Sequence, residues 1–139
     1  MDTFQIQPHQ KNASYTQPHF FIQSKGYNSG KPTSYPVNDC LVVLVNDELE
    51  KGMLFWTCFS LWKAKEFIPL LDQSPMPILK IDEAIELIDM TCLHLAHYPE
   101  KFLSQIREMK ELIKTEKLLS TQLQLIKKIK RGTARKSFR

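Results

Sequence analysis

The sequence predicts an α+β fold, in which a small sheet packs with helices and a long amphipathic helix follows. Three observations predict it. Residues 40–45 are a continuous run of aliphatic residues between turn residues, which is typical of a strand buried on both faces. Apolar residues then recur with a helical period over 48–67 and again after Asp82. A final apolar pattern in heptads extends over 100–130.

The first part of the chain contains the predicted strands. Residues 1–19 are polar and lack periodicity, and we expect them to form a flexible N-terminal arm. Residues 20–25 are a candidate first strand, and Gly26 to Gly30 is a turn cluster. With 139 residues, 42% of them hydrophobic, the chain is long enough for one domain of ordinary size. We therefore expect an α+β domain over 20–97.

Two helices follow the buried strand. Asp47 is a candidate cap for the first helix, and Pro69 lies just beyond its end. Residues 73–81 contain two prolines and are expected to form an edge strand or a shaped loop. Asp82 is a candidate cap for the second helix. The apolar face expected for the first helix consists of Phe55, Cys58, Phe59 and Trp62.

The last predicted helix, over 99–131, is too long for so small a domain to cover fully. We therefore expect part of it to pack on a partner, either a second copy of the chain or a helical protein. A basic tail is expected over 132–139. The residues predicted to form the oligomer interface share the heptad positions of this coiled coil, and they are Met109, Leu112, Leu119, Leu123 and Ile126.

The charge distribution is strongly asymmetric. Residues 1–126 contain 12 basic and 15 acidic residues, a net charge of −3, whereas the end of the chain is basic without any acid. Such a segment suits contacts with nucleic-acid phosphates. It equally suits a helix terminus in solvent, where cations complement the helix dipole, and membrane-surface binding ranks third. The candidate nucleic-acid-binding residues are Lys127, Lys128, Lys130, Arg131, Arg135, Lys136 and Arg139.

Other motifs have simpler explanations than a site. The segment from Gly26 to Lys31 resembles a phosphate loop, but it has one residue too few between its glycines and Pro32 in place of the hydroxyl residue. Cys92, His94 and His97 lack an evident fourth ligand for zinc. Trp56, Phe59 and Trp62 have the side chains to stack bases, but their helical spacing favours a core role. We predict no catalytic residues, no metal and no cofactor.

The sequence also bears on the compartment. No apolar stretch is long enough to span a membrane, and the N-terminus lacks the features of a secretory signal. Three cysteines without a CxxC pair are expected to be reduced thiols. We therefore expect a cytoplasmic protein.

Two resemblances to known families add to these observations. The segments GYNSGKP, LFWTCFSLWKAKEFIPLL and PMPILKIDEAIELI resemble a family of small uncharacterised proteins from Bacteroidetes. The order of elements over 32–139 is also similar to half of a type I restriction specificity (S) subunit. There a target-recognition domain precedes a spacer helix, like the helix here that ends in KLLSTQLQLIKKIKRGTARKSFR. The Pro-Glu-Gln signature of that family is absent, and the chain has one domain where an S subunit has two.

The restriction-subunit resemblance implies a target-recognition-domain-like fold, a helix that pairs antiparallel with another, and ancestry in DNA binding. The sequence as a whole predicts a non-enzymatic DNA-binding or DNA-associated module. In this hypothesis the basic end contacts phosphates and the long helix mediates self-association, giving a homodimer. The alternative is a protein–protein interaction module that docks through the same helix.

Overall fold

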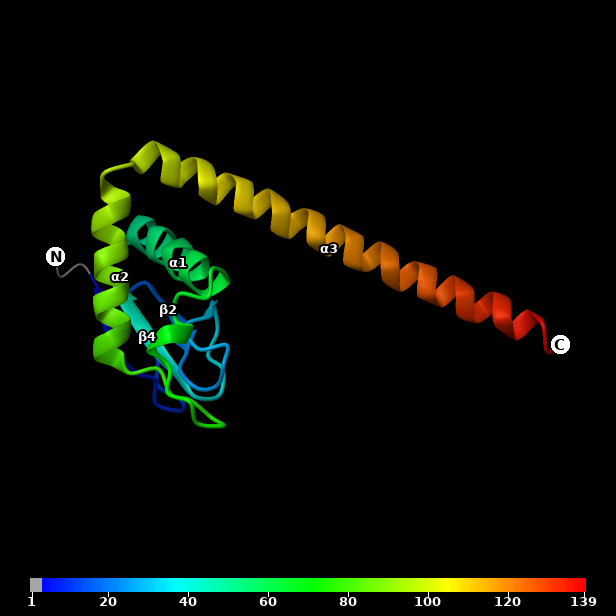
Figure 1. Ribbon diagram of the computed structural model, residues 1–139, viewed down its shortest axis with the longest axis horizontal. Coiled ribbons are helices and arrows are strands. Elements are labelled where there is room, and N and C mark those ends of the chain that lie inside the picture. The colour runs from blue at the N-terminus through cyan, green and yellow to red at the C-terminus, as the bar shows by residue number, and fades with distance from the viewer. Residues whose placement is uncertain (1–3) are drawn as a thin grey trace. The chain divides into compact units, whose positions relative to one another are not determined.

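The computed structural model describes residues 4–139. The chain divides into two units, one ending at His97 and the other beginning at Tyr98. The first unit contains a four-stranded sheet and two α-helices, and the second is a single long helix (Figure 1). The predicted α+β class with a long C-terminal helix is confirmed.

The sheet is antiparallel and has the strand order β1-β4-β2-β3. β4 (Cys40–Val45) lies between β1 (Phe4–Pro8) and β2 (His19–Gln23), and β3 (Pro32–Thr33) lies at the edge beside β2. All six residues of β4 are buried, as its continuous aliphatic sequence predicts.

The prediction of a flexible arm over 1–19 is wrong for Phe4–Pro8 and for His19, which lie in strands, while residues 9–18 form a loop. Phe4–Pro8 pairs with β4 along its full length, and residues 1–3 lie outside the described part of the chain. Ile6 is the buried residue of this strand, so its stability comes mainly from the backbone ladder rather than from side-chain burial. The sequence signal was an alternation of Phe4 and Ile6 with two glutamines, which is too short for a firm prediction.

Two helices cover one face of the sheet. α1 (Glu48–Lys63) and α2 (Ile81–Ala96) contribute Leu54, Cys58, Leu61, Ala84 and Ile88 to a core that includes the inward residues of the three longer strands. Asp47 caps α1, accepting a hydrogen bond from the Glu50 amide at 2.8 Å. Lys80 is the residue before α2, so Asp82 lies in the first turn and is not the cap.

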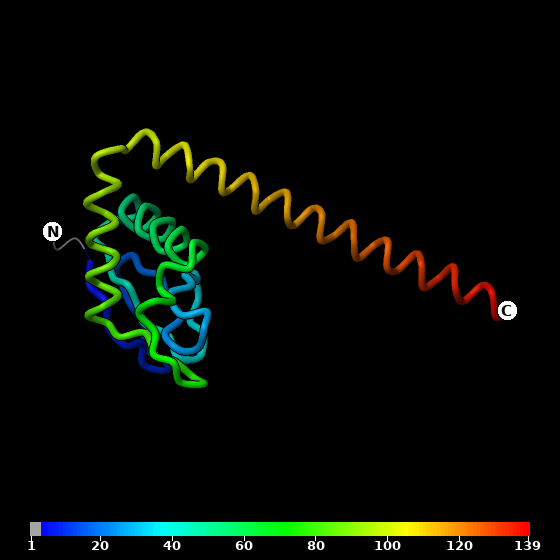
Figure 2. Tube along the Cα trace, in the orientation of Figure 1, coloured from blue at the N-terminus to red at the C-terminus, as the bar shows by residue number. Residues whose placement is uncertain are grey.

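The connection from α1 to α2 is a shaped loop (Figure 2). It contains a short 3₁₀ turn, η1 (Ile68–Leu70), and an isolated bridge between Ile78 and Lys25. The prolines of this segment prevent a regular strand. Phe67 and Leu79, both nearly fully buried, anchor the loop to the core.

The opposite face of the sheet has a smaller core. Phe21, Cys40, Val42 and Leu44 are buried there, and the half-buried Tyr15 and Val37 from neighbouring loops pack against them. The residues before β2 are thus partly packed, which again contradicts a fully flexible arm.

The second unit consists of Tyr98, α3 (Pro99–Lys136) and the three residues after it. The helix is 38 residues long and begins with Pro99 in its first turn, where proline is favoured. The predicted helix ended at 131, but the structure continues it to Lys136. Most of the expected basic tail is therefore helical, because Gly132 is an isolated glycine between good helix formers.

Candidate functional sites

The exposed apolar residues of α3 gather on one side of the helix. Projected at 3.6 residues per turn, those between 118 and 129 occupy a sector about 160° wide. Each of them is at least 52% exposed. We call this surface the apolar face, and it consists of Leu118, Leu119, Leu123, Leu125, Ile126 and Ile129.

The structure separates the predicted interface residues into two groups. Leu119, Leu123 and Ile126 belong to the apolar face, and Leu112, also exposed, lies on the same side nearer the start of the helix. Met109 is half-buried and shares its side with Phe102 and Ile106, the buried residues of α3.

Three members of the apolar face were missed by the sequence reasoning. Leu118, Leu125 and Ile129 lie beside the two heptad positions used to predict the interface. A pattern restricted to those two positions therefore leaves them out. Listing every aliphatic residue between 118 and 129 by its helical angle would have found them.

The seven predicted nucleic-acid-binding residues are all exposed. Six lie within α3, and Arg139 follows it. Lys127, Arg131 and Arg135 recur at every fourth residue, so they lie in line along the helix, and Lys128 lies beside them. This basic row, defined as Lys127, Lys128, Arg131 and Arg135, is opposite the centre of the apolar face. Lys130 and Lys136 lie at the two margins of that face.

The electrostatics of the two units are opposite in sign. Residues 4–97 contain 7 basic and 10 acidic residues, a net charge of −3, whereas residues 98–139 contain 12 basic and 4 acidic residues, a net charge of +8. After Glu116 the helix contains no acid at all. The basic row therefore has no carboxylate neighbours on its own helix within two turns.

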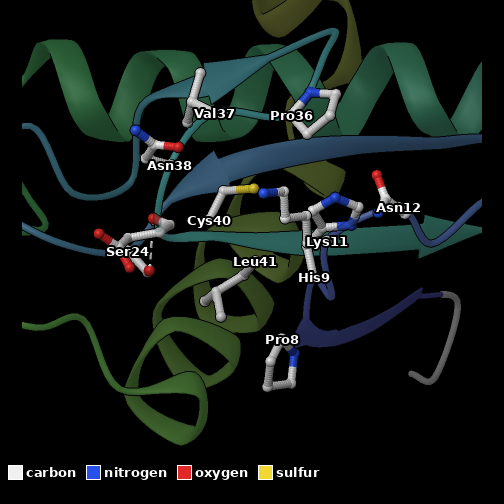
Figure 3. Close-up of a pocket in the computed structure, with 11 residues that line it drawn as sticks. Pro8, His9, Lys11, Asn12, Ser24, Pro36, Val37, Asn38, Cys40 and Leu41 are labelled. Atoms are coloured by element: carbon white, nitrogen blue, oxygen red, sulfur yellow. Dashed lines mark hydrogen bonds between the residues drawn. The ribbon is translucent and has the colours of Figure 1, made fainter.

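A hollow of about 840 Å³ lies in the first unit, where β1 ends and β4 begins (Figure 3). Its lining includes His9, Lys11, Asp39 and Cys40. The Ser24 hydroxyl, also on this wall, donates a hydrogen bond to the Asp39 carbonyl at 2.7 Å. An exposed ion pair joins Asp39 to Lys25 at 3.9 Å, and such pairs contribute little to stability.

The thiol in this hollow is poorly suited to nucleophilic chemistry. Burial raises the pKa of Cys40; a hydrogen bond with the Val37 backbone opposes this, and the nearby Asp39 charge adds to it. A raised pKa keeps the sulfur protonated near neutral pH, whereas the thiolate is the reactive form. The Nδ1 atom of His9, the neighbouring imidazole, is 2.9 Å from the Tyr15 hydroxyl.

The structure also shows where the other motifs considered as sites in the sequence lie. Gly26 and Gly30 both have positive φ, as a tight turn requires, and the turn hydrogen bonds run back to the carbonyls of Gly26 and Gln23. Among the described residues no group of three histidine, cysteine or acidic side chains is placed to hold a metal ion. Trp56, Phe59 and Trp62 are half-buried and form a chain of ring contacts along α1, so the expectation that they are core residues is only partly met.

No helix in the described part of the chain combines the length and the apolar character needed to cross a membrane.

The chain belongs to a family of unknown function, DUF6943, whose model matches residues 6–136. The match extends from β1 to the last residue of α3, so the family includes the sheet unit and the long helix together. No curated protein and no solved structure matches the chain. These comparisons give no support to the resemblance to type I restriction specificity subunits.

Proposed function

We propose that the protein is a non-enzymatic, DNA-associated binding module in which α3 has two roles. The apolar face pairs with the same face of a second copy, and the basic row contacts phosphates. The observation that supports this most directly is the placement of the two surfaces on opposite sides of one continuous helix. Because they are opposite, burying one in a dimer leaves the other in solvent.

The electrostatic part of the proposal follows from counterion release. Each lysine or arginine that neutralises a phosphate displaces a condensed cation from DNA, so binding weakens steeply as salt rises. The net charge of +8 on the second unit also favours encounter with a polyanion, whereas the first unit has a net charge of −3.

The test is a salt titration of labelled duplex DNA, followed by fluorescence anisotropy. Replacing Lys127, Arg131 and Arg135 with glutamine removes three charges from the basic row. Because the proposed dimer presents two basic rows and loses six charges, we expect the slope of log affinity against log salt to become shallower by about 5, at about 0.9 per phosphate contact.

A matched variant controls for net charge. Lys101, Arg107 and Lys114 are exposed on the same helix, outside the basic row, and their replacement with glutamine removes the same charge. The proposal requires this variant to keep most of the wild-type slope. Equal slopes in the two variants would show a non-specific charge effect and no phosphate site.

The second candidate function is that of a protein–protein interaction module, favoured by the exposure of the apolar face. In that case α3 docks on a different protein and the cations keep it in solution. A wild-type protein that is monomeric in solution and does not bind DNA at low salt would favour this candidate.

A further inference from the structure

We propose that a groove beside the C-terminal end of α1 binds a nucleotide unit, with the phosphate held by lysines and the base stacked on Trp62. The groove belongs entirely to the first unit, so the inference goes beyond the proposed function of α3 and does not depend on it. It has a volume of about 350 Å³, and its lining is Tyr27, Asn28, Ser29, Trp62, Lys63, Lys65, Phe67 and Ile68.

The groove gathers positive charge within a unit that is negative overall. Lys63 and Lys65 line it, and Lys31 approaches the same tryptophan. No acidic residue lines the groove, and none of the ion pairs found among the described residues involves these three lysines. Like charges brought together without a counter-charge repel each other, and a bound phosphate relieves that repulsion.

Trp62 supplies a fixed aromatic surface. Trp62 packs against the core and is half-buried, so part of its side chain remains accessible. The ammonium groups of Lys31 and Lys63 lie 5.3 and 5.0 Å from the ring centroid. At exposed sites such cation–π contacts are weak, so a planar base is able to replace one of them while the lysine moves to the phosphate.

Lys65 occupies a backbone position where glycine is favoured. α1 ends in a Schellman motif, in which the Glu66 amide donates to the Leu61 carbonyl at 2.8 Å and the Lys65 amide donates to the Trp62 carbonyl at 3.0 Å. Lys65 is the left-handed residue of that motif, with φ of 63°. A lysine here costs stability relative to glycine and places its side chain at the groove, the pattern expected of a functional residue.

The opposite wall of the groove is built by the glycine turn. Gly30 has φ of 94°, and a Cβ there would overlap the Phe67 ring. The turn therefore closes directly on Phe67, which is 1% exposed, and this contact fixes the spacing between Tyr27–Ser29 and the end of α1.

The test uses Trp62 as its own reporter. The chain has two tryptophans, so Trp56→Phe leaves Trp62 alone. In this background we titrate an oligothymidylate of about eight nucleotides, thymidine monophosphate and inorganic phosphate, and follow tryptophan quenching. We expect saturable quenching by the oligonucleotide and by the mononucleotide, with inorganic phosphate binding at least tenfold more weakly because it lacks a base to stack.

The decisive variant is Lys65→Gly. We expect it to weaken oligonucleotide binding several-fold and to raise Tm by about 2 to 4 °C, because glycine relieves the left-handed strain. Lys65→Arg should retain the binding. Since Lys65→Gly is expected to be the more stable protein, lost binding is not explained by unfolding.

A second variant tests whether binding at this groove is independent of the cations of α3. A variant with glutamine in place of Lys127, Arg131 and Arg135 should retain the quenching of Trp62 by nucleotides, whether or not it loses duplex binding. The inference is overturned if nucleotides do not quench Trp62, if Lys65→Gly binds as tightly as wild type, or if the quenching depends on the α3 cations.

Discussion

Gly30 shows how one residue determines the shape of the first unit. Its φ of 94° is readily available to glycine, and the Phe67 ring fills the space that a side chain would need. The sequence predicted the turn from its two glycines. It did not predict the contact with Phe67, because 36 intervening residues separate them and no local pattern encodes that packing.

Gly30→Ala is expected to destabilise the protein by about 2 to 4 kcal/mol, from left-handed strain together with overpacking against Phe67. Gly52→Ala is the matched control, because Gly52 lies within α1 with no atom near the added Cβ. It should stabilise the protein by about 0.5 to 1 kcal/mol. Urea denaturation measures both, and equal effects would contradict this account of the turn.

Cys58 connects stability to pH. It is fully buried, and burial raises the pKa of its thiol well above the ordinary value, with a smaller increase from the nearby Cys92. The folded state therefore favours the protonated thiol. The contribution of Cys58 to the free energy of unfolding is fully present below the pKa of the thiol in the unfolded chain, about 8.5. It declines as pH rises above that value.

We expect the free energy of unfolding to fall by about 1.4 kcal/mol per pH unit above about pH 8.5 through Cys58 alone. Cys58→Ala should be less stable near neutral pH but should show a shallower decline. Chemical denaturation between about pH 8 and pH 10 measures the two slopes. Parallel curves would show that this thiol is not linked to folding.

At the scale of elements, α3 shows what periodicity predicts and what it misses. The heptad pattern correctly predicted a long helix, and Leu119, Leu123 and Ile126, predicted as interface residues, are exposed on it. It grouped Met109 with them because one template was applied to the whole helix. The α-helical period drifts relative to a heptad, so residues that share a heptad position diverge around a straight helix. β1 was missed for a different reason, since an edge strand with one buried residue has almost no sequence signal.

The apolar face should drive self-association. Leu119→Asp with Leu123→Asp introduces two charges into this face, and by light scattering we expect a dimer for the wild type and a monomer for this variant. Ser120→Asp with Gln124→Asp is the matched control, since it adds the same charge with the same spacing on the opposite side of α3. A monomeric wild type, or a dimer in both variants, would contradict the assignment of this face.

At the scale of the whole molecule, the α+β class was predictable and the division into two units was predictable in outline. The buried run of β4 and the length of α3 are both visible in the sequence. The groove beside α1 was not predictable, because it brings a turn at 27–29 together with a helix end at 62–65. The family match covers both units, so the family model includes the sheet unit and the long helix together.

The central claim is that one helix joins two copies and presents their cations to DNA. The most direct test is the salt dependence of duplex binding by wild type and by a Leu119→Asn, Leu123→Asn variant, which disrupts the apolar face without adding charge, with the equally uncharged Ser120→Asn, Gln124→Asn variant as control. A dimer presents two basic rows and a monomer one, so we predict a slope of about half the wild-type value for the first variant and a nearly unchanged slope for the control. Equal slopes in the two variants, or no binding by the wild type at low salt, would contradict the claim.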